Sequence, residues 1–205
     1  LITLYVQYEF SYDKFIQNSE NIYKVSLERK YPNHATFYAP IPHSYSEAMG
    51  RDIPEVKQVT RISAPNNNVV ITYKDGRGEQ KVFEEDFVVT ADSNFFTFFH
   101  LPFVKGDPSN VLHNANDIVI TETTSKKYFG DEEAIGKTLD FFGLSFKVSG
   151  VCQDMPANSH MRFNVIGNMT AIPFFKQPNY IGFSAYVYVE LNPGADFKVV
   201  ESKIP

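Results

Sequence analysis

Residues 40–62, PIPHSYSEAMGRDIPEVKQVTRI, contain the signals that decide the fold. Pro42 stands near the start of the segment, where a helix tolerates proline. Tyr45 and Met49 follow four residues apart, which is the spacing of neighbours on one helical face. Pro54 lies just past the apolar pattern and ends it. The segment therefore predicts a short amphipathic helix.

A strand is predicted on each side of this helix. Residues 56–62, VKQVTRI, are rich in β-branched residues, and residues 22–29 form an extended run in front of the helix. Strand, helix and strand together predict a βαβ unit. Ahead of it, Ser11 predicts the N-cap of a short helix that carries Phe15 and Ile16.

The middle of the chain changes to hairpins. Residues 67–73 and 80–91 flank an Asp75-Gly76 reversal, which predicts two antiparallel strands. Ser93 predicts an N-cap for a short buried helix with four phenylalanines. Further predicted elements are a strand at 117–122, a helix at 122–129 that ends at Gly130, a hairpin at 137–154 that turns at Gly143, a strand at 184–191 and the start of a helix at 195–204.

The composition of the chain excludes several classes of function and structure. The 205 residues carry a net charge of −5 with a pI near 5.5, so no basic surface is available for nucleic acid. The lone Cys152 excludes an internal disulfide but leaves the compartment open. No apolar run reaches the roughly 18 residues that a membrane span needs. The chain ends look cut, so we expect a piece of a longer protein, with the N-terminal cut just outside a membrane helix.

One segment resembles a nucleotide-binding loop. Residues 128–138, YFGDEEAIGKT, end in the Gly-Lys-Thr of a P-loop, but five residues instead of four separate Gly130 from Gly136. Three of those five are acidic and would repel a triphosphate. We therefore expect a helix end, an acidic turn and a strand start, with no nucleotide.

No other catalytic pattern is present. Ser184 in GFSAY lacks the second glycine of a nucleophile elbow, because Tyr186 takes its place, and we expect a buried strand residue. His100 is expected in the core or at a helix cap. The five histidines form no metal-binding spacing, and Cys152 has no cysteine partner. The sequence predicts no catalytic residue, no cofactor site and no metal site, and hence no enzyme.

Five blocks of sequence occur together in the order found in one family. They are YEFSYDKFIQNSENIYKV at 8–25, ADSNFFTFFHLPFVKGDPSNVL at 91–112, VITETTSKKYFGDEEAIGKTL at 119–139, VSGVCQDMPANSHMRFNVI at 148–166 and YVYVELNPGADFKVVESKI at 186–204. Together they resemble the MacB-like periplasmic core domain of FtsX/MacB-type ABC transporter permeases.

The resemblance implies an α+β fold of two subdomains. Residues 1–20 would be the end of a membrane helix with a connecting helix. Residues 21–63 and 183–205 would form a porter-like βαβ subdomain whose last strand is missing, and residues 64–182 an inserted β-rich lobe. The domain would lie on the periplasmic side of the bacterial inner membrane.

The resemblance also implies a function and partners. The domain would be non-catalytic and would couple cytoplasmic ATP hydrolysis to substrate movement or export, with ATP bound by a separate nucleotide-binding domain. Expected partners are the membrane helices of the same permease, the ATP-binding subunit, a second permease copy, and a periplasmic adaptor or a transported peptide or lipoprotein. Nucleic acid is not among them.

An alternative is a sensor or ligand-binding module that captures a peptide or small molecule between its lobes, because aromatic residues are abundant. For the partner-facing surface, the sequence offers one turn of the inserted lobe, since loops carry function more often than core does. That turn consists of Lys74, Asp75, Gly76, Arg77 and Gly78.

Overall fold

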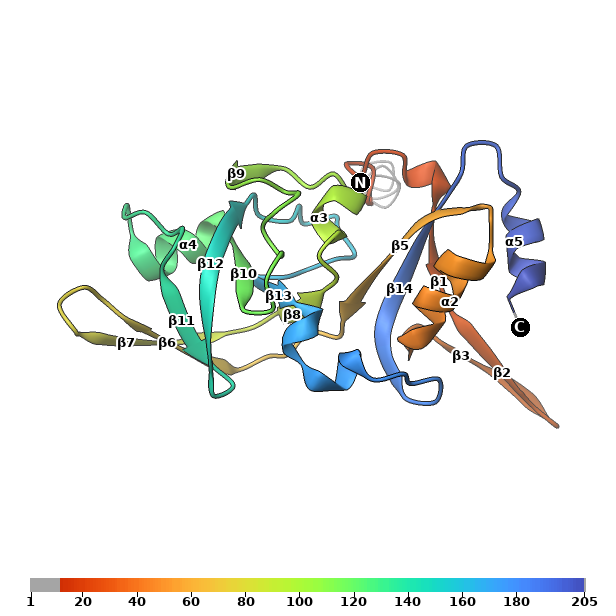
Figure 1. Cartoon of the computed structure of the whole chain (residues 1–205), viewed down its shortest axis with the longest axis horizontal. Helices are drawn as coiled ribbons and strands as arrows, with labels where there is room; N and C mark the ends of the chain where they lie inside the picture. Colours follow the sequence, from red (N-terminus) through yellow and green to blue (C-terminus); the bar gives the residue numbers. More distant parts are fainter. Residues whose placement is uncertain (1–11, 205) are drawn as a thin grey trace, which may run out of the picture. The chain divides into compact units, whose positions relative to one another are not determined.

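The structure is a computed structural model that describes residues 12–204, and these form two compact units. Unit 1 contains the residues up to Gln17 and Pro65–Ala171. Unit 2 contains Asn18–Ala64 and the residues from Ile172 onward. The chain therefore forms unit 2 from two separate segments, with most of unit 1 inserted between them (Figure 1).

Unit 2 is a three-stranded antiparallel sheet with two helices. Its sheet order is β1-β14-β5, and the short β4 also pairs with β14. Because β1 and β5 both run antiparallel to β14, they are parallel to each other, and α2 connects them as the predicted βαβ unit requires. The elements are η1 (Ser19–Asn21), β1 (Ile22–Val25), β2 (Leu27–Tyr31), β3 (His34–Tyr38), β4 (Ile41–Pro42), α2 (Ser44–Asp52), β5 (Val56–Ser63), η3 (Pro173–Lys176), β14 (Phe183–Leu191) and α5 (Phe197–Lys203).

The core of unit 2 follows from alternation on β14. Val187, Val189 and Leu191 point to one face and are at most 3% exposed. Met49 of α2 and Val200 of α5 belong to the same buried cluster. Both helices therefore contribute to one core with the central strand.

The β2–β3 ribbon was not predicted from the sequence. It is a two-stranded sheet of its own, paired from Leu27 with Tyr38 to Tyr31 with His34, and it leaves the body of unit 2 (Figure 1). Most of its residues are exposed, so it has no apolar alternation to mark it as strand.

Unit 1 is a mixed sheet in the order β8-β13-β10-β12-β11-β6-β7, with β9 added on β12. β10 runs parallel to β12 and β13 parallel to β8, whereas the other pairs are antiparallel. The elements are β6 (Val69–Lys74), β7 (Gln80–Glu85), β8 (Val88–Ala91), α3 (Phe95–Phe98), β9 (Phe103–Lys105), β10 (Asp117–Thr121), α4 (Glu122–Phe129), β11 (Thr138–Phe141), β12 (Leu144–Cys152), β13 (Val165–Asn168) and η2 (Met169–Ala171).

The core of unit 1 surrounds β10, all of whose residues are buried. Ile118 and Ile120 pack in one cluster with Leu139 and Val148, and all four are fully buried. The four phenylalanines at 95, 96, 98 and 99 are also buried, as expected, and their rings meet edge to face. The mixed sheet with few helices confirms the predicted α+β class.

Several local expectations are confirmed. Helix α2 lies inside the predicted segment, α4 ends at Gly130, and the hairpin β11–β12 turns at Gly143, whose φ of 74° suits glycine. Strand β14 and helix α5 also lie where expected. Among residues 12–204, no helix has the length and apolar character to cross a membrane.

Other local expectations were wrong. Phe15 and Ile16 lie in turns, not in a helix, because Asp13 and Asn18 adopt left-handed backbone angles that interrupt helical continuity. The expected N-cap at Ser11 lies outside the described residues. Helix α3 begins after Asn94, not Ser93.

The predicted strand over 80–91 is two strands. It breaks at Asp86 and Phe87, where Phe87 has a φ of 55°. Two hydrogen bonds connect this break to the loop before β6. Asn68 N–H donates to Asp86 Oδ1 at 2.9 Å, and Phe87 N–H donates to Asn67 Oδ1 at 3.1 Å.

Candidate interaction surfaces

The turn expected to face a partner caps the β6–β7 hairpin of unit 1. Its residues are exposed except for Asp75, which is half-buried. Asp75 Oδ1 accepts hydrogen bonds from the N–H groups of Glu79 and Arg77, each at 2.9 Å. The bond from Glu79, followed by that from Arg77, lowers the pKa of Asp75. Asp75 thus organises the turn, and Gly78 supplies its left-handed residue at φ 82°.

The hairpin that carries this turn has two different faces. Ile71 and Tyr73 are buried in the core cluster, and Phe83 packs against it. On the opposite face, Val70 and Val82 are 59% and 60% exposed. The β6–β7 hairpin, here called the arm, therefore presents apolar side chains to its surroundings on one face, with the charged turn at its end.

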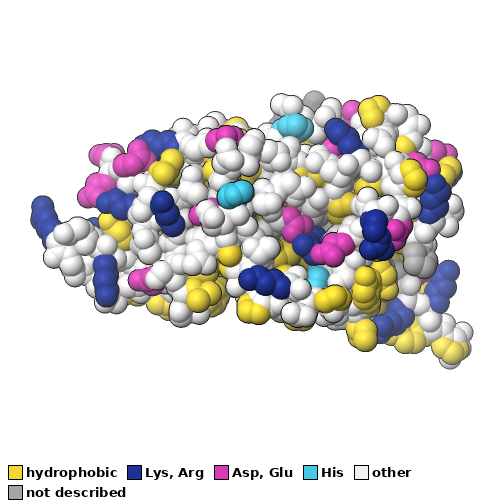
Figure 2. All heavy atoms as spheres, viewed as in Figure 1, with side chains coloured by type: hydrophobic (Ala, Val, Ile, Leu, Met, Phe, Trp, Pro, Cys, Tyr) yellow, Lys and Arg dark blue, Asp and Glu magenta, His cyan; other side chains and the backbone are white. Residues whose placement is uncertain are grey.

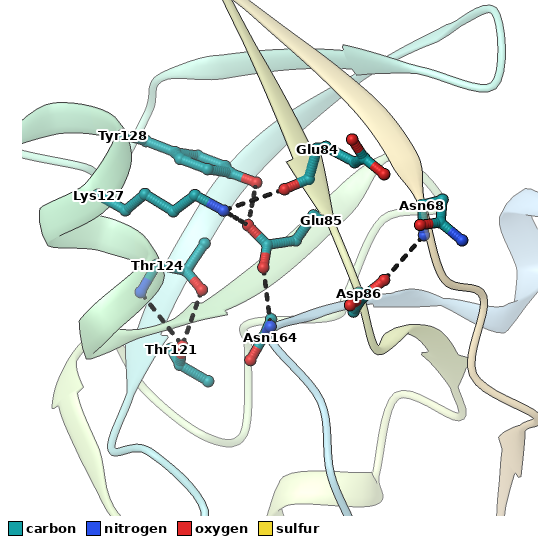
Figure 3. Close-up of polar contacts among 9 residues, drawn as sticks. All are labelled: Asn68, Glu84, Glu85, Asp86, Thr121, Thr124, Lys127, Tyr128 and Asn164. Atoms are coloured by element: carbon teal, nitrogen blue, oxygen red, sulfur yellow. Dashed lines mark hydrogen bonds and ion pairs between the residues drawn. The ribbon is translucent and has the colours of Figure 1, made fainter.

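A buried carboxylate anchors the base of the arm. Glu85, the last residue of β7, is 5% exposed and accepts three hydrogen bonds (Figure 3). Lys127 Nζ donates at 2.7 Å and Tyr128 Oη at 2.8 Å, both to Oε2, while Asn164 Nδ2 donates to Oε1 at 2.8 Å. Lys127 also donates to the Glu84 carbonyl at 3.1 Å.

This network joins three distant parts of unit 1. Glu85 belongs to β7, Lys127 and Tyr128 belong to α4, and Asn164 stands just before β13 (Figure 3). Burial, and then the hydrogen bond to Glu85, raises the pKa of Tyr128, so the phenol stays protonated and donates. A buried carboxylate with three donors fixes the base of the hairpin to α4 and to the segment before β13.

The start of α4 is fixed in the same region. Thr121 is its N-cap, and its hydroxyl oxygen accepts from Thr124 N–H at 3.3 Å (Figure 3). Thr121 Oγ1 also donates to Thr124 Oγ1 at 2.9 Å. The helix that supplies two of the donors to Glu85 is therefore capped at its first turn.

The Gly-Lys-Thr segment has the expected structural role. Gly130, at φ 63°, ends α4, and Gly136, at φ 87°, leads into β11. Lys137 Nζ donates to Glu132 at 2.5 Å and to the Tyr73 hydroxyl at 2.9 Å. These two bonds raise the pKa of Lys137, and they direct its ammonium to groups of its own fold.

Ser184 has a partner that the sequence did not reveal. It is half-buried on β14, and its Oγ lies 3.1 Å from Nδ1 of His43, which is 1% exposed. His43 Nε2 lies 2.8 Å from the Gln177 carbonyl, to which it donates, so Nδ1 accepts from the serine. The rings of Phe174 and Phe175 meet His43 edge to face. This contact fastens the loop before β14 to the start of α2.

The remaining candidate residues are structural. His100 is exposed and follows Phe99, the C-cap of α3, with a φ of 50°, so it lies just past the helix end and not in the core. His160 Nδ1 lies 2.7 Å from Asp13 Oδ2. Cys152 is buried, which raises the pKa of its thiol to about 12. Within residues 12–204, no group of three or more histidine, cysteine or carboxylate side chains is arranged for a metal ion.

Unit 2 contains an apolar groove along β1. Its volume is about 670 Å³, and among the described residues β1 pairs with no strand besides β14, so its other edge is open. The apolar lining includes Tyr23, Val25, Leu27, Ile41, Tyr45, Met49, Val189, Leu191, Phe197, Val200 and Ile204. The groove is therefore mainly apolar, and Lys24, Glu28, Lys30 and Glu201 also belong to its lining.

Comparison with known proteins relates this chain to one protein family. A family model described as the MacB-like periplasmic core domain matches residues 1–205. Among curated proteins, none matches the sequence.

Solved structures have the same fold. A permease domain from Porphyromonas gingivalis is 20% identical, with a TM-score of 0.80 over 92% of this chain and 80% of that one. The periplasmic region of MacB from Actinobacillus actinomycetemcomitans is 16% identical, with a TM-score of 0.63 over 93% and 85%. The extracellular domain of the noncanonic ABC-type transporter YknZ from Gram-positive bacteria is 15% identical, with a TM-score of 0.60 over 88% of each chain.

Proposed function

Because the chain belongs to the family of MacB-like periplasmic core domains, we propose that it couples ATP hydrolysis to substrate movement outside the membrane. The family is that of periplasmic domains of MacB- and FtsX-like ABC transporter permeases. In this proposal ATP binds to a separate cytoplasmic nucleotide-binding domain, and the domain itself needs no cofactor and performs no catalysis. The match over the whole chain is the observation that carries the proposal.

The internal construction of the units supports a mechanical role. A unit tends to move as a rigid body when its core is close-packed, as around β10, and when buried hydrogen-bond networks such as that of Glu85 hold its elements together. The chain passes between the units at residues 17–18, 64–65 and 171–172, so displacement of one unit is transmitted covalently to the other.

The proposed partners follow from the family. They are the membrane helices of the same permease, its cytoplasmic ATP-binding subunit and a second permease copy, with a periplasmic adaptor or a transported peptide or lipoprotein as further partners. The domain would work on the periplasmic side of the inner membrane.

The open edge of β1 fits the strand that the sequence predicts as the last of the porter-like part. The crossover from β1 through α2 to β5 spans β14, which lies between the two strands. A crossover of the same kind from β14 through α5 would span β1 and place its strand on the open edge. That strand would cover the groove with its apolar side chains.

The proposal is tested in the full-length permease, reconstituted in nanodiscs with its ATP-binding subunit. Spin labels are placed through Phe37→Cys in unit 2 and Arg77→Cys in unit 1, both at exposed positions. The buried Cys152 thiol, with its pKa raised to about 12, should not react. We expect trapping with ATP and vanadate to change the distance between the labels, whereas ADP should not. An unchanged distance during active ATP hydrolysis would contradict the proposal.

A further inference from the structure

Residues 12–17 lead into unit 2 along the chain, but they belong to unit 1 and are bonded to it. Asp13 N–H donates to the Asn158 carbonyl at 3.1 Å. The Asp13 carboxylate accepts from His160 twice, from its main-chain N–H at 3.0 Å and from Nδ1 at 2.7 Å. Because an ionised carboxylate only accepts, Nδ1 is the donor in this contact. Three hydrogen bonds therefore connect residues 12–17, here called the strap, to the loop of unit 1 that precedes β13.

The strap is a folded turn and not an extended linker. Asp13 has a φ of 57°, in the left-handed region that aspartate accepts more readily than most residues. Ile16 N–H donates to the Asp13 carbonyl at 3.0 Å, which closes the turn. The Ile16 side chain is 6% exposed, so apolar burial adds to the polar contacts. The strap is therefore held by both kinds of contact.

The loop that receives the strap continues into the core of unit 1. Met161 and Phe163, which follow His160, are at most 4% exposed. The loop then ends at Asn164, whose Nδ2 donates to Glu85 at the base of the arm (Figure 3). The contact with the strap and the buried anchor of the arm are thus carried by the same short segment.

Surface charge gives the strap little additional hold. On the face drawn in Figure 2, acidic and basic side chains are interspersed. Where charges of both signs alternate in this way, their attraction at long range is largely cancelled. The short bonds of Asp13 and the burial of Ile16 then determine where the strap lies, so substitutions at these contacts should release it.

The strap changes how a displacement of the N-terminal segment would enter the domain. Without it, the displacement would pass into unit 2 at Asn18 and would reach unit 1 only through residues 64–65 and 171–172. With it, the displacement acts on unit 1 directly, at His160. The buried side chains after His160 then carry it to the base of the arm.

We propose that the strap transmits displacement of the N-terminal segment directly to unit 1, with Asp13 and His160 as the positioning residues that hold it. This inference rests on the proposed function, because that function supplies the displacement. It adds the unit on which the displacement acts first and the contact through which it acts.

The test measures hydrogen exchange in the full-length permease, reconstituted in nanodiscs with its ATP-binding subunit. Mass spectrometry follows the peptide that contains residues 158–164, with ADP and after trapping with ATP and vanadate. In the parent, trapping should speed its exchange about fivefold, the lower end of typical coupling between sites, because displacement of the strap loads the bonds to His160. Exchange that does not respond to trapping in the parent would overturn the strap.

Asp13→Gly removes the carboxylate and keeps the left-handed backbone. With ADP, exchange of 158–164 should be about tenfold faster than in the parent, the loss expected for charge-assisted hydrogen bonds, and trapping should no longer change it. His160→Ala keeps the main-chain bond to Asp13, so exchange should be only about fivefold faster. A full response to trapping in both variants would contradict the proposal.

Arg162→Ala is the matched control, because Arg162 is exposed on the same loop. It should keep the response to trapping and change the ADP rate less than about twofold. Slow exchange in β10, all of whose residues are buried, shows that each variant is folded. A loss of response in Arg162→Ala equal to that in Asp13→Gly would mean that any change in the loop has this effect, and would overturn the role of the strap.

The outcomes separate this inference from the proposed function. A changed distance between the labels at Phe37→Cys and Arg77→Cys, with unchanged exchange at 158–164, would overturn the strap and leave the proposed function standing. An unchanged distance with changed exchange at 158–164 would contradict the proposed function and support the strap.

Discussion

The two projecting hairpins of this domain differ in how they are anchored. At the base of β6–β7, the buried Glu85 receives three donors from its own unit. On β2–β3, Arg29 lies over the Phe183 ring of β14, with its guanidinium carbon 5.6 Å from the ring centre, and Tyr38 stacks on the same ring. One hairpin is therefore anchored by a buried, hydrogen-bonded carboxylate, and the other by contacts of its exposed strands with one aromatic ring.

This difference is one of strength. A buried carboxylate with three hydrogen-bond donors costs much to disrupt. A cation or a ring that stacks on an aromatic side chain at the surface contributes less to folding. Mutations in the buried anchor should therefore lower the free energy of unfolding more than mutations at the base of the ribbon.

The largest effect is expected from Glu85→Ala. The change leaves Lys127, Tyr128 and Asn164 without their acceptor, so the free energy of unfolding should fall by about 3 kcal/mol. Urea denaturation at pH 7 measures it. Glu84→Ala is the control, because that side chain is exposed, and it should fall within about 0.5 kcal/mol of the parent. Equal losses in the two variants would show that the anchor contributes no more than a surface residue.

Tyr128→Phe should lower the free energy of unfolding by about 1.5 kcal/mol, because it removes one donor to Glu85. The substitution should also change how the free energy of unfolding depends on pH. Since folding raises the pKa of Tyr128, its contribution is complete below about pH 10 and decreases as the pH rises further. Denaturation from pH 8 to 11 should show a steeper loss in the parent than in the variant. Parallel curves would contradict the donor role.

Phe183→Leu should have a smaller effect, about 1 kcal/mol, because it removes the stacking of Tyr38 and the ring beneath Arg29 but keeps apolar bulk. The loss should appear mainly as faster amide hydrogen exchange in β2 and β3. If exchange in the ribbon stayed unchanged while β14 became less protected, Phe183 would serve the sheet and not the ribbon.

Asp75→Asn should have the smallest effect. Its pKa is lowered by the bonds from Glu79 and Arg77, so the contribution of Asp75 is present at neutral pH and is lost as the pH falls through about 4 and below. The difference in urea midpoint between pH 7 and pH 3 should therefore be slightly smaller in the variant. An identical difference would mean that the carboxylate charge does not organise the turn.

Local signals gave the parts of the fold that depend on neighbouring residues. The helix end at Gly130 and the turn at Gly143 depend on backbone angles that few residue types accept, so their positions could be predicted. The βαβ unit followed from helix and strand periodicity. The turn at 74–78 is exposed except for Asp75, and its contact with a partner stays a prediction.

Other features depend on residues that are far apart in the sequence. Glu85 receives its donors from positions 42 to 79 residues away, and no spacing rule connects them. The same holds for His43 and Ser184, which are 141 residues apart. The β2–β3 ribbon was missed because its exposed strands lack the apolar alternation from which strands are predicted.

The most direct test compares one residue from the base of each hairpin. The free energy of unfolding in urea at pH 7 is measured for the parent, for Glu85→Ala at the base of β6–β7 and for Phe183→Leu beneath β2–β3. The structure predicts a loss of about 3 kcal/mol for Glu85→Ala and about 1 kcal/mol for Phe183→Leu. Equal losses, or a larger loss for Phe183→Leu, would contradict the assignment of the stronger anchor to the buried carboxylate.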